Sequence, residues 1–183
     1  MPVVTVAVFY TSLSGNTREA AEIVAGAIGG TPVDIVQDAA EREALLDELR
    51  AGRLAMALFG TYTWGDGELP EAMRRFLRRL LIEEGHLYLP AMPPTAVFGT
   101  GDSIFPRYCR AADAVYYHLE KHGVRLVLPV MKIEQSPYGL DQAPRLEAWA
   151  EAAQAAAGAG RPTARALRRS AAAPLLTRNK PRG

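Results

Sequence analysis

Five short apolar segments alternate with five helical segments along this chain of 183 residues, and the alternation limits the fold more than any other feature. The first segment is almost continuously apolar and rich in β-branched residues, which is typical of a strand buried on both faces. We expect strands at Val3–Phe9, Pro32–Val36, Leu54–Gly60, Thr95–Gly99 and Val124–Ile133. Because parallel strands are joined by right-handed crossovers, this order predicts an α/β fold with one parallel sheet and helices on both faces.

The helical segments carry apolar residues at a spacing of three and four, and several end at glycine. We expect helices from Asn16 to about Ile28, then at Glu41–Arg50, Pro70–Ile82, Pro106–Lys121 and Asp141–Ala157. The third helix has four arginines on its outer side. Glu71 and Glu83 can pair with Arg75 and Arg79 at i,i+4 spacing, so we expect a solvated face and no contact with DNA.

The length favours one domain, and the charge divides the chain into two parts. Seven of the 21 Lys and Arg residues lie between Arg161 and Gly183, where there is no acid. The first 160 residues therefore hold 14 bases against 20 acids, a net charge of −6. We expect a domain over residues 1–157 and a basic, disordered tail over residues 158–183.

The sequence also favours a cytoplasmic protein without a metal site. No apolar run approaches the ~20 residues of a membrane span, and the N-terminus lacks the pattern of a signal peptide. Cys109 is the only cysteine, and we expect it to be buried in the helix that starts near Pro106. His118 and His122 have a spacing that metals use, but no third ligand is evident.

A hydroxyl- and glycine-rich turn connects the first strand to the first helix. It contains Ser12, Ser14, Asn16 and Thr17 as side-chain donors, and Gly15 allows close approach of the backbone. Free N–H groups and the positive end of the helix dipole favour an anion there. The turn has no lysine, so it is not a Walker loop. An ordinary helix N-cap is the alternative interpretation.

Two further loops follow the third and fourth strands and leave the sheet from the same edge, where ligands of such folds bind. They span residues 60–67 and 99–106, and each holds an aromatic residue, Trp64 or Phe105, beside glycine and aspartate. Large apolar groups in polar loops need a cover. Either each aromatic packs on its own loop, or the two loops and the turn together bind a flat ring with a phosphorylated tail.

In these three segments the chain resembles the flavodoxins. The phosphate-loop pattern of that family matches residues 12–17, its Thr-Trp-Gly-Asp segment matches residues 63–66, and its Gly-x-Gly-Asp segment matches residues 99–102. The resemblance covers residues 1 to about 157, and the uninterrupted last strand is similar to the short-chain branch. It implies a flavodoxin-like, doubly wound sandwich with strand order 2-1-3-4-5 and the cofactor FMN.

The resemblance also implies a set of FMN-binding residues. They are Thr11, Ser12, Leu13, Ser14, Gly15, Asn16, Thr17, Thr61, Tyr62, Thr63, Trp64, Gly65, Asp66, Gly99, Thr100, Gly101, Asp102, Phe105 and Tyr108. Trp64 would cover one face of the ring. Phe105 stands where the family usually has a tyrosine on the other face, and Tyr108 is a less favoured substitute.

The polar contacts follow from the same resemblance. Ser12, Ser14, Asn16 and Thr17 would hold the phosphate, and the backbone of residues 100–102 would meet the pyrimidine edge. The peptide after Gly65 would turn towards the ring on reduction, which requires an accessible positive φ.

The implied function is one-electron transfer by a monomer, without a catalytic residue. The expected partners are a flavodoxin or ferredoxin reductase as donor and acceptor oxidoreductases. Acidic residues near the flavin, such as Asp66 and Asp102, should disfavour the fully reduced ring and meet a basic partner surface. Two alternatives stay open: an FMN-dependent quinone or flavin reductase on this fold, and an interaction module that has lost its cofactor.

Overall fold

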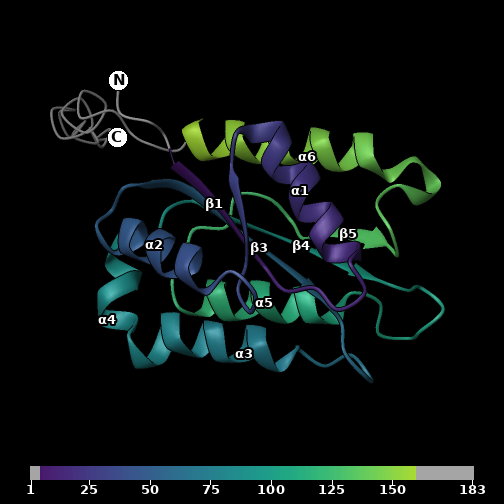
Figure 1. Cartoon of the computed structure of the whole chain (residues 1–183), viewed down its shortest axis with the longest axis horizontal. Helices are drawn as coiled ribbons and strands as arrows, with labels where there is room; N and C mark the ends of the chain where they lie inside the picture. Colours follow the sequence, from purple (N-terminus) through teal and green to yellow (C-terminus); the bar gives the residue numbers. More distant parts are fainter. Residues whose placement is uncertain (1–4, 160–183) are drawn as a thin grey trace, which may run out of the picture.

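The computed structural model describes residues 5–159 as an open sheet between two layers of helices (Figure 1). The strands are β1 (Thr5–Tyr10), β2 (Thr31–Asp34), β3 (Leu54–Tyr62), β4 (Thr95–Gly101) and β5 (Met131–Glu134). The helices are α1 (Asn16–Ile28), α2 (Ala39–Arg50), α3 (Glu71–Arg78), α4 (Gly85–Tyr88), α5 (Arg110–Lys121) and α6 (Gln142–Ala159), with a π-helical turn at Arg79–Glu83 and 3₁₀ turns at Leu89–Ala91 and Gly139–Asp141. The expected disordered tail lies, from residue 160 onwards, outside the described residues.

The sheet has the strand order β2-β1-β3-β4-β5, and all four neighbouring pairs are parallel. This confirms the doubly wound order 2-1-3-4-5. Each of the first four strands is followed by a crossover to the next strand, and all five strands run in the same direction, so the loops after them leave from the carboxyl edge of the sheet. Among residues 5–159, no helix is long and apolar enough to cross a membrane.

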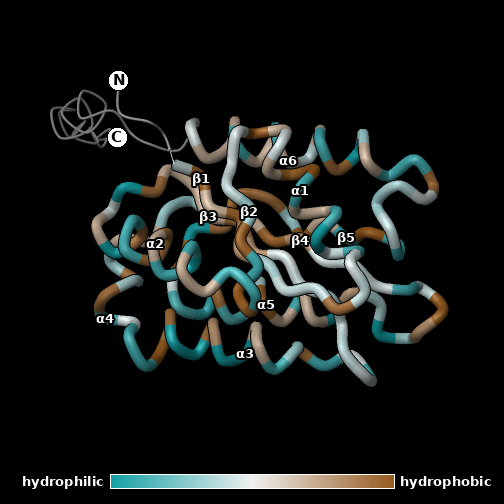
Figure 2. Tube along the Cα trace, viewed as in Figure 1, coloured by the Kyte–Doolittle hydropathy of each residue, from teal (hydrophilic) through white to brown (hydrophobic). Residues whose placement is uncertain are grey.

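The sheet is buried on both faces by two separate apolar clusters. In β1, Val6, Val8 and Tyr10 face the cluster under α1 and α6, whereas Ala7 and Phe9 face the cluster under α2, α3 and α5. Figure 1 shows the two helix layers on opposite sides of the strands. In Figure 2 these helices alternate between hydrophilic and hydrophobic residues, as burial on one side requires.

The last strand differs from the expectation of an uninterrupted strand over Val124–Ile133, which was wrong. Leu126 makes an isolated parallel bridge to Thr95, and regular pairing resumes only between Met131 and Phe98. Between these two pairings the chain advances by three residues in β4, from Thr95 to Phe98, but by five residues from Leu126 to Met131. Pro129 lies inside this interruption and has no N–H to donate to a neighbouring strand.

The segment before α5 also differs from the prediction. The helix begins at Arg110 and not near Pro106, so Cys109 occupies the N-cap position, with a left-handed φ of 51°. The expectation that Cys109 lies within a helix was therefore wrong, although the side chain is fully buried as expected. The short helix α4 has no counterpart in the sequence prediction.

The arginines of the third helical segment form ion pairs, which supports the solvated face expected for them. Glu71 pairs with Arg75 at 2.7 Å, but Glu83 pairs with Arg78 and not with Arg79. Arg79 instead makes two hydrogen bonds, of 2.7 and 3.0 Å, to Glu43 of α2. These bonds lower the pKa of the Glu43 carboxyl and connect two helices of the same layer.

Strand β4 approaches helix α5 most closely at Gly99. A Cβ atom built on Gly99 would lie 2.5 Å from the Cβ of Ala112 and 3.2 Å from the backbone oxygen of Thr61. Neither atom is the end of a flexible side chain, so neither can move without moving the helix or the strand. Gly99 is therefore required by packing.

We expect Gly99→Ala to lower the free energy of unfolding by about 1–3 kcal/mol, because the added methyl group overpacks the strand–helix contact. Urea denaturation measures this. Gly26→Ala is the matched control, since Gly26 is exposed in α1 and a Cβ there meets no atom within 4 Å. The control should raise stability by about 0.5–1 kcal/mol. Similar effects of the two substitutions would contradict the packing argument.

Candidate functional site

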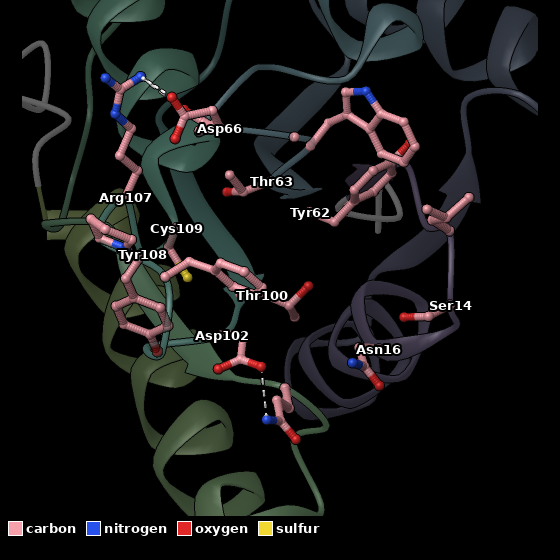
Figure 3. A pocket seen from close by; sticks show the side chains of 18 residues that line it. Ser14, Asn16, Tyr62, Thr63, Asp66, Thr100, Asp102, Arg107, Tyr108 and Cys109 are labelled. Carbon is pink, nitrogen blue, oxygen red and sulfur yellow. Dashed lines mark hydrogen bonds and ion pairs between the residues drawn. The ribbon is translucent and has the colours of Figure 1, made fainter.

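A cleft of about 440 Å³ opens at the carboxyl edge of the sheet (Figure 3). Its volume lies in the range of ligand pockets, roughly 300–1,000 Å³. The predicted site residues that line it are Leu13, Ser14, Asn16, Tyr62, Thr63, Trp64, Gly65, Asp66, Thr100, Gly101, Asp102, Phe105 and Tyr108. The fold thus brings together all three segments that the sequence singles out. In Figure 3, Ser14 and Asn16 lie across the cleft from Arg107 and Tyr108.

The remaining predicted site residues lie outside this lining. They are Thr11, Ser12, Gly15, Thr17, Thr61 and Gly99. Thr11, Thr17, Thr61 and Gly99 are buried. The Thr11 N–H donates to the backbone oxygen of Gly60 at 3.1 Å, which holds the end of β1 against β3. These residues support the cleft from behind.

The turn after β1 has the features of an anion site. Gly15 has a φ of 99°, and the Ser12 hydroxyl oxygen accepts hydrogen bonds from the N–H groups of Gly15 and Arg18. Within residues 5–159, the N–H groups of residues 12–14, 16 and 17 have no partner. They stand at the N-terminus of α1, where the helix dipole is positive. This donor set fits a phosphate group.

A buried hydrogen bond connects this turn with the third loop. The hydroxyl oxygens of Thr17 and Thr100 lie 2.8 Å apart, and both residues are almost fully buried. The Thr17 side chain is therefore engaged inside the protein, while the hydroxyl of Ser14 faces the cleft. Of the four side-chain donors that the sequence predicts in this turn, Ser14 and Asn16 line the cleft.

Two exposed aromatic residues line the cleft, as the sequence predicts. Trp64 is 52% exposed and Phe105 is 64% exposed, so neither packs under its own loop. Tyr62 and Tyr108 are half-buried, and burial raises the pKa of both phenols. The cleft thus offers large apolar surfaces and neutral hydroxyl groups, which fits a flat ring system.

The loop after β3 makes a tight turn at Trp64–Gly67. The Gly67 N–H donates to the Trp64 carbonyl oxygen at 3.1 Å. Gly65 has a φ of 50°, in the left-handed region that favours glycine, whereas Asp66 has a negative φ. Gly65 already has the positive φ that the resemblance to flavodoxins requires it to reach.

The sequence prediction missed five residues of the lining. They are Gly67, Pro106, Arg107, Cys109 and Gln135. Arg107 donates to the backbone oxygen of Asp66 at 2.8 Å, and its guanidinium lies 3.4 Å from the Asp66 carboxylate. A Cβ on Gly67 would lie 2.7 Å from the Arg107 side chain. The sequence shows Gly67 after Asp66, and a glycine there is a signal that another segment approaches closely. No feature of the sequence indicates that this segment contains Arg107.

Cys109 closes the floor of the cleft. Its thiol lies 3.7 Å from the backbone oxygen of Gly99 and 3.9 Å from that of Ile133. A Cβ on Gly101 would be 2.9 Å from the sulfur, so the two residues fit only because Gly101 lacks one. Burial raises the pKa of the Cys109 thiol to about 11, which keeps it protonated and unreactive. The ring of His122 is engaged elsewhere, since its Nδ1 lies 2.8 Å from the backbone oxygen of His118.

Comparisons with known proteins agree on one family. The family model described as Flavodoxin matches residues 8–149. Probable flavodoxin 2 of Bacillus subtilis is 31% identical over 133 residues, which cover 73% of this chain and 83% of the relative. The crystal structure of oxidised flavodoxin 2 from Bacillus cereus superimposes with a TM-score of 0.65 at 26% identity, over 82% and 97% of the two chains. An NADPH-dependent diflavin oxidoreductase 1 of Emericella nidulans is 30% identical over 67% of this chain, but only 18% of that protein is covered.

The thiol makes stability depend on pH. The folded state keeps the Cys109 proton until about pH 11, whereas an unfolded thiol loses it near pH 9.0. The unfolded state therefore binds fewer protons in this window, and stability falls as the pH rises through it. We expect a loss of about 2–3 kcal/mol from this group. Urea denaturation between pH 8 and 11 should show a shallower decline for Cys109→Ser, and identical declines would contradict the assignment.

Proposed function

The chain belongs to the flavodoxin family, and on that premise we propose that it binds FMN non-covalently in the cleft and carries single electrons between redox proteins. The observation that carries the proposal is the convergence of unpaired N–H groups and two exposed aromatic residues on one cleft. The bound flavin supplies the redox chemistry, and the protein binds and orients it.

The turn after β1 would bind the phosphate. Its unpaired N–H groups, the hydroxyl of Ser14 and the amide of Asn16 are the donors, and Ser12 maintains the turn from within. The Arg18 guanidinium lies beside this turn, 3.6 Å from the position of a Cβ on Gly15. Its charge complements the phosphate without occupying the cleft.

The other two loops would bind the ring. Trp64 and Phe105 cover its faces and exclude water, and Tyr62 adds to the apolar wall. The Asp102 N–H, which has no partner in the described part of the chain, is available to the polar edge of the ring. Gly67 and Arg107 keep the two loops at a constant separation.

The groups at the cleft favour a carrier over an enzyme. The only thiol of the lining is buried and protonated, and the two tyrosines have raised pKa values. None of these groups is suited to act as a base or nucleophile at neutral pH. A reductase would be the donor, and oxidoreductases would be the acceptors.

A second candidate is a reductase that oxidises NADPH itself. The similarity to part of an NADPH-dependent diflavin oxidoreductase is the observation in its favour. However, this chain covers 18% of that protein, so the match extends over a small portion of it. We therefore keep the carrier as the main proposal.

We expect Ser14→Ala to weaken FMN binding about 10- to 150-fold, because a hydrogen bond to a charged group contributes roughly 1.5–3 kcal/mol. Riboflavin has the same ring and no phosphate, so its affinity should change little. Fluorescence titration of the apoprotein with both ligands measures the difference. Equal losses of affinity for FMN and riboflavin would contradict the proposal that this turn binds the phosphate.

The role of carrier predicts that the FMN-loaded protein does not consume NADPH by itself but transfers electrons once a flavodoxin reductase is added. Absorbance at 340 nm with an electron acceptor measures both. A heat-inactivated reductase is the control. Steady NADPH oxidation by this protein alone would favour the reductase, and a purified protein that refuses FMN would favour an interaction module.

A further inference from the structure

A fourth segment, Gln135–Asp141 between β5 and α6, borders the cleft. Gln135 belongs to the lining although it follows β5 and not one of the three predicted loops. Its N–H donates to the Gly101 carbonyl oxygen at 2.7 Å, and its side-chain Nε2 donates to the Asp102 carboxylate at 3.2 Å. The dashed line at Asp102 in Figure 3 marks the second contact. The segment is thus attached to the loop after β4.

The same segment is attached to the helix that follows the phosphate turn. The Ser136 hydroxyl donates to the Glu19 carboxylate at 2.9 Å, and Glu19 lies in the first turn of α1. The segment therefore bridges α1 and the third loop. In the proposed binding mode the phosphate lies at the turn before α1 and the ring at the third loop, so the middle portion of the ligand would pass the side of the cleft that Gln135 lines.

A buried amide holds the segment in place from behind. Gln142 is 6% exposed, and its Nε2 donates to the backbone oxygens of Glu134 at 2.8 Å and Gly139 at 3.0 Å. Its Oε1 accepts from the Glu134 N–H at 2.7 Å. These bonds hold both ends of the segment, so the position of Gln135 is determined by the fold.

The backbone of the segment is strained. Gln135, Leu140 and Asp141 have φ values of 50°, 55° and 51°, in the left-handed region that favours glycine. Such strain persists only where the surroundings impose it, and it is common in segments that hold ligands. A glycine at position 135 would relieve it, yet the chain has a glutamine there.

The side chain of Gln135 has its acceptor oxygen left for a ligand. Its Nε2 is engaged by Asp102, whereas its Oε1 has no donor within residues 5–159. We propose that this oxygen accepts a hydrogen bond from the polyol chain that joins the ring of FMN to its phosphate. The inference rests on the proposed function and adds a fourth binding segment to it.

Affinities for three flavins can distinguish a contact to the polyol from contacts to the ring or the phosphate. FMN has ring, polyol and phosphate, riboflavin lacks the phosphate, and lumiflavin has the ring alone. Gln135→Ala should weaken FMN and riboflavin by the same factor, about 2- to 12-fold for one neutral hydrogen bond, and leave lumiflavin unchanged. Fluorescence titration of the full-length apoprotein measures all three affinities.

Gln135→Gly distinguishes binding from structure. It removes the same oxygen but relieves the strained φ, so we expect the melting temperature to stay at or above that of Gln135→Ala while the loss of FMN and riboflavin affinity is the same. Gln154→Ala is the control, because Gln154 is likewise an exposed glutamine with one amide contact, to the Ile28 backbone oxygen at 3.0 Å, and it does not line the cleft. The control should bind all three flavins as the parent does.

Two results would overturn the inference while leaving the proposed function intact. One is unchanged affinity for FMN and riboflavin in both Gln135 variants. The other is an equal loss for lumiflavin, which would mean that Gln135 shapes the ring site and not the polyol site. A parent protein that binds neither FMN nor riboflavin would overturn the proposed function itself.

Discussion

The structure depends on burying a parallel sheet on both faces. Phe9, Phe59 and Phe98, one in each of the three inner strands, are fully buried. Since parallel strands cannot be joined by tight turns, each connection crosses a face of the sheet as a helix and buries it. The loops that follow the strands then all leave from one edge. The cleft is a consequence of this arrangement, and its lining residues are separated by up to about 120 positions in the sequence.

Close backbone packing makes the floor of the cleft rigid. The absence of a Cβ at Gly99 lets α5 pack closely on β4, and its absence at Gly101 leaves room for the thiol of Cys109. A Cβ at either glycine would clash with these neighbours. The hydroxyl pair of Thr17 and Thr100 joins this floor to α1. A floor of this kind places ligand-binding groups on fixed elements, and it lowers the cost of ordering them when a ligand binds.

Ion pairs change the electrostatic character expected for the rim. The sequence predicts an acidic edge, but Asp66 lies beside Arg107, and Glu71 pairs with arginines of its own helix. Each pair reduces the field that the acid alone would produce at the cleft. Glu68 and Asp102 have no ion pair within residues 5–159, so both add unpaired negative charge to this edge. The edge that the sequence predicts to meet a basic partner surface is therefore mixed in charge.

The sequence by itself determined the order of strands and helices along the chain, the carboxyl edge as the place of the cleft, and the turn, Trp64 and Phe105 as parts of its lining. These features depend on local periodicity and on residue types with few alternatives. Element ends were less predictable, since Cys109 adopts a left-handed φ where its thiol and backbone nitrogen lie against Gly101, a distant contact that no local pattern shows. Only the tertiary structure decided that Arg107 faces Asp66 and that Gln135 borders the cleft. Contacts between distant segments depend on how the helices pack, and no local pattern encodes that packing.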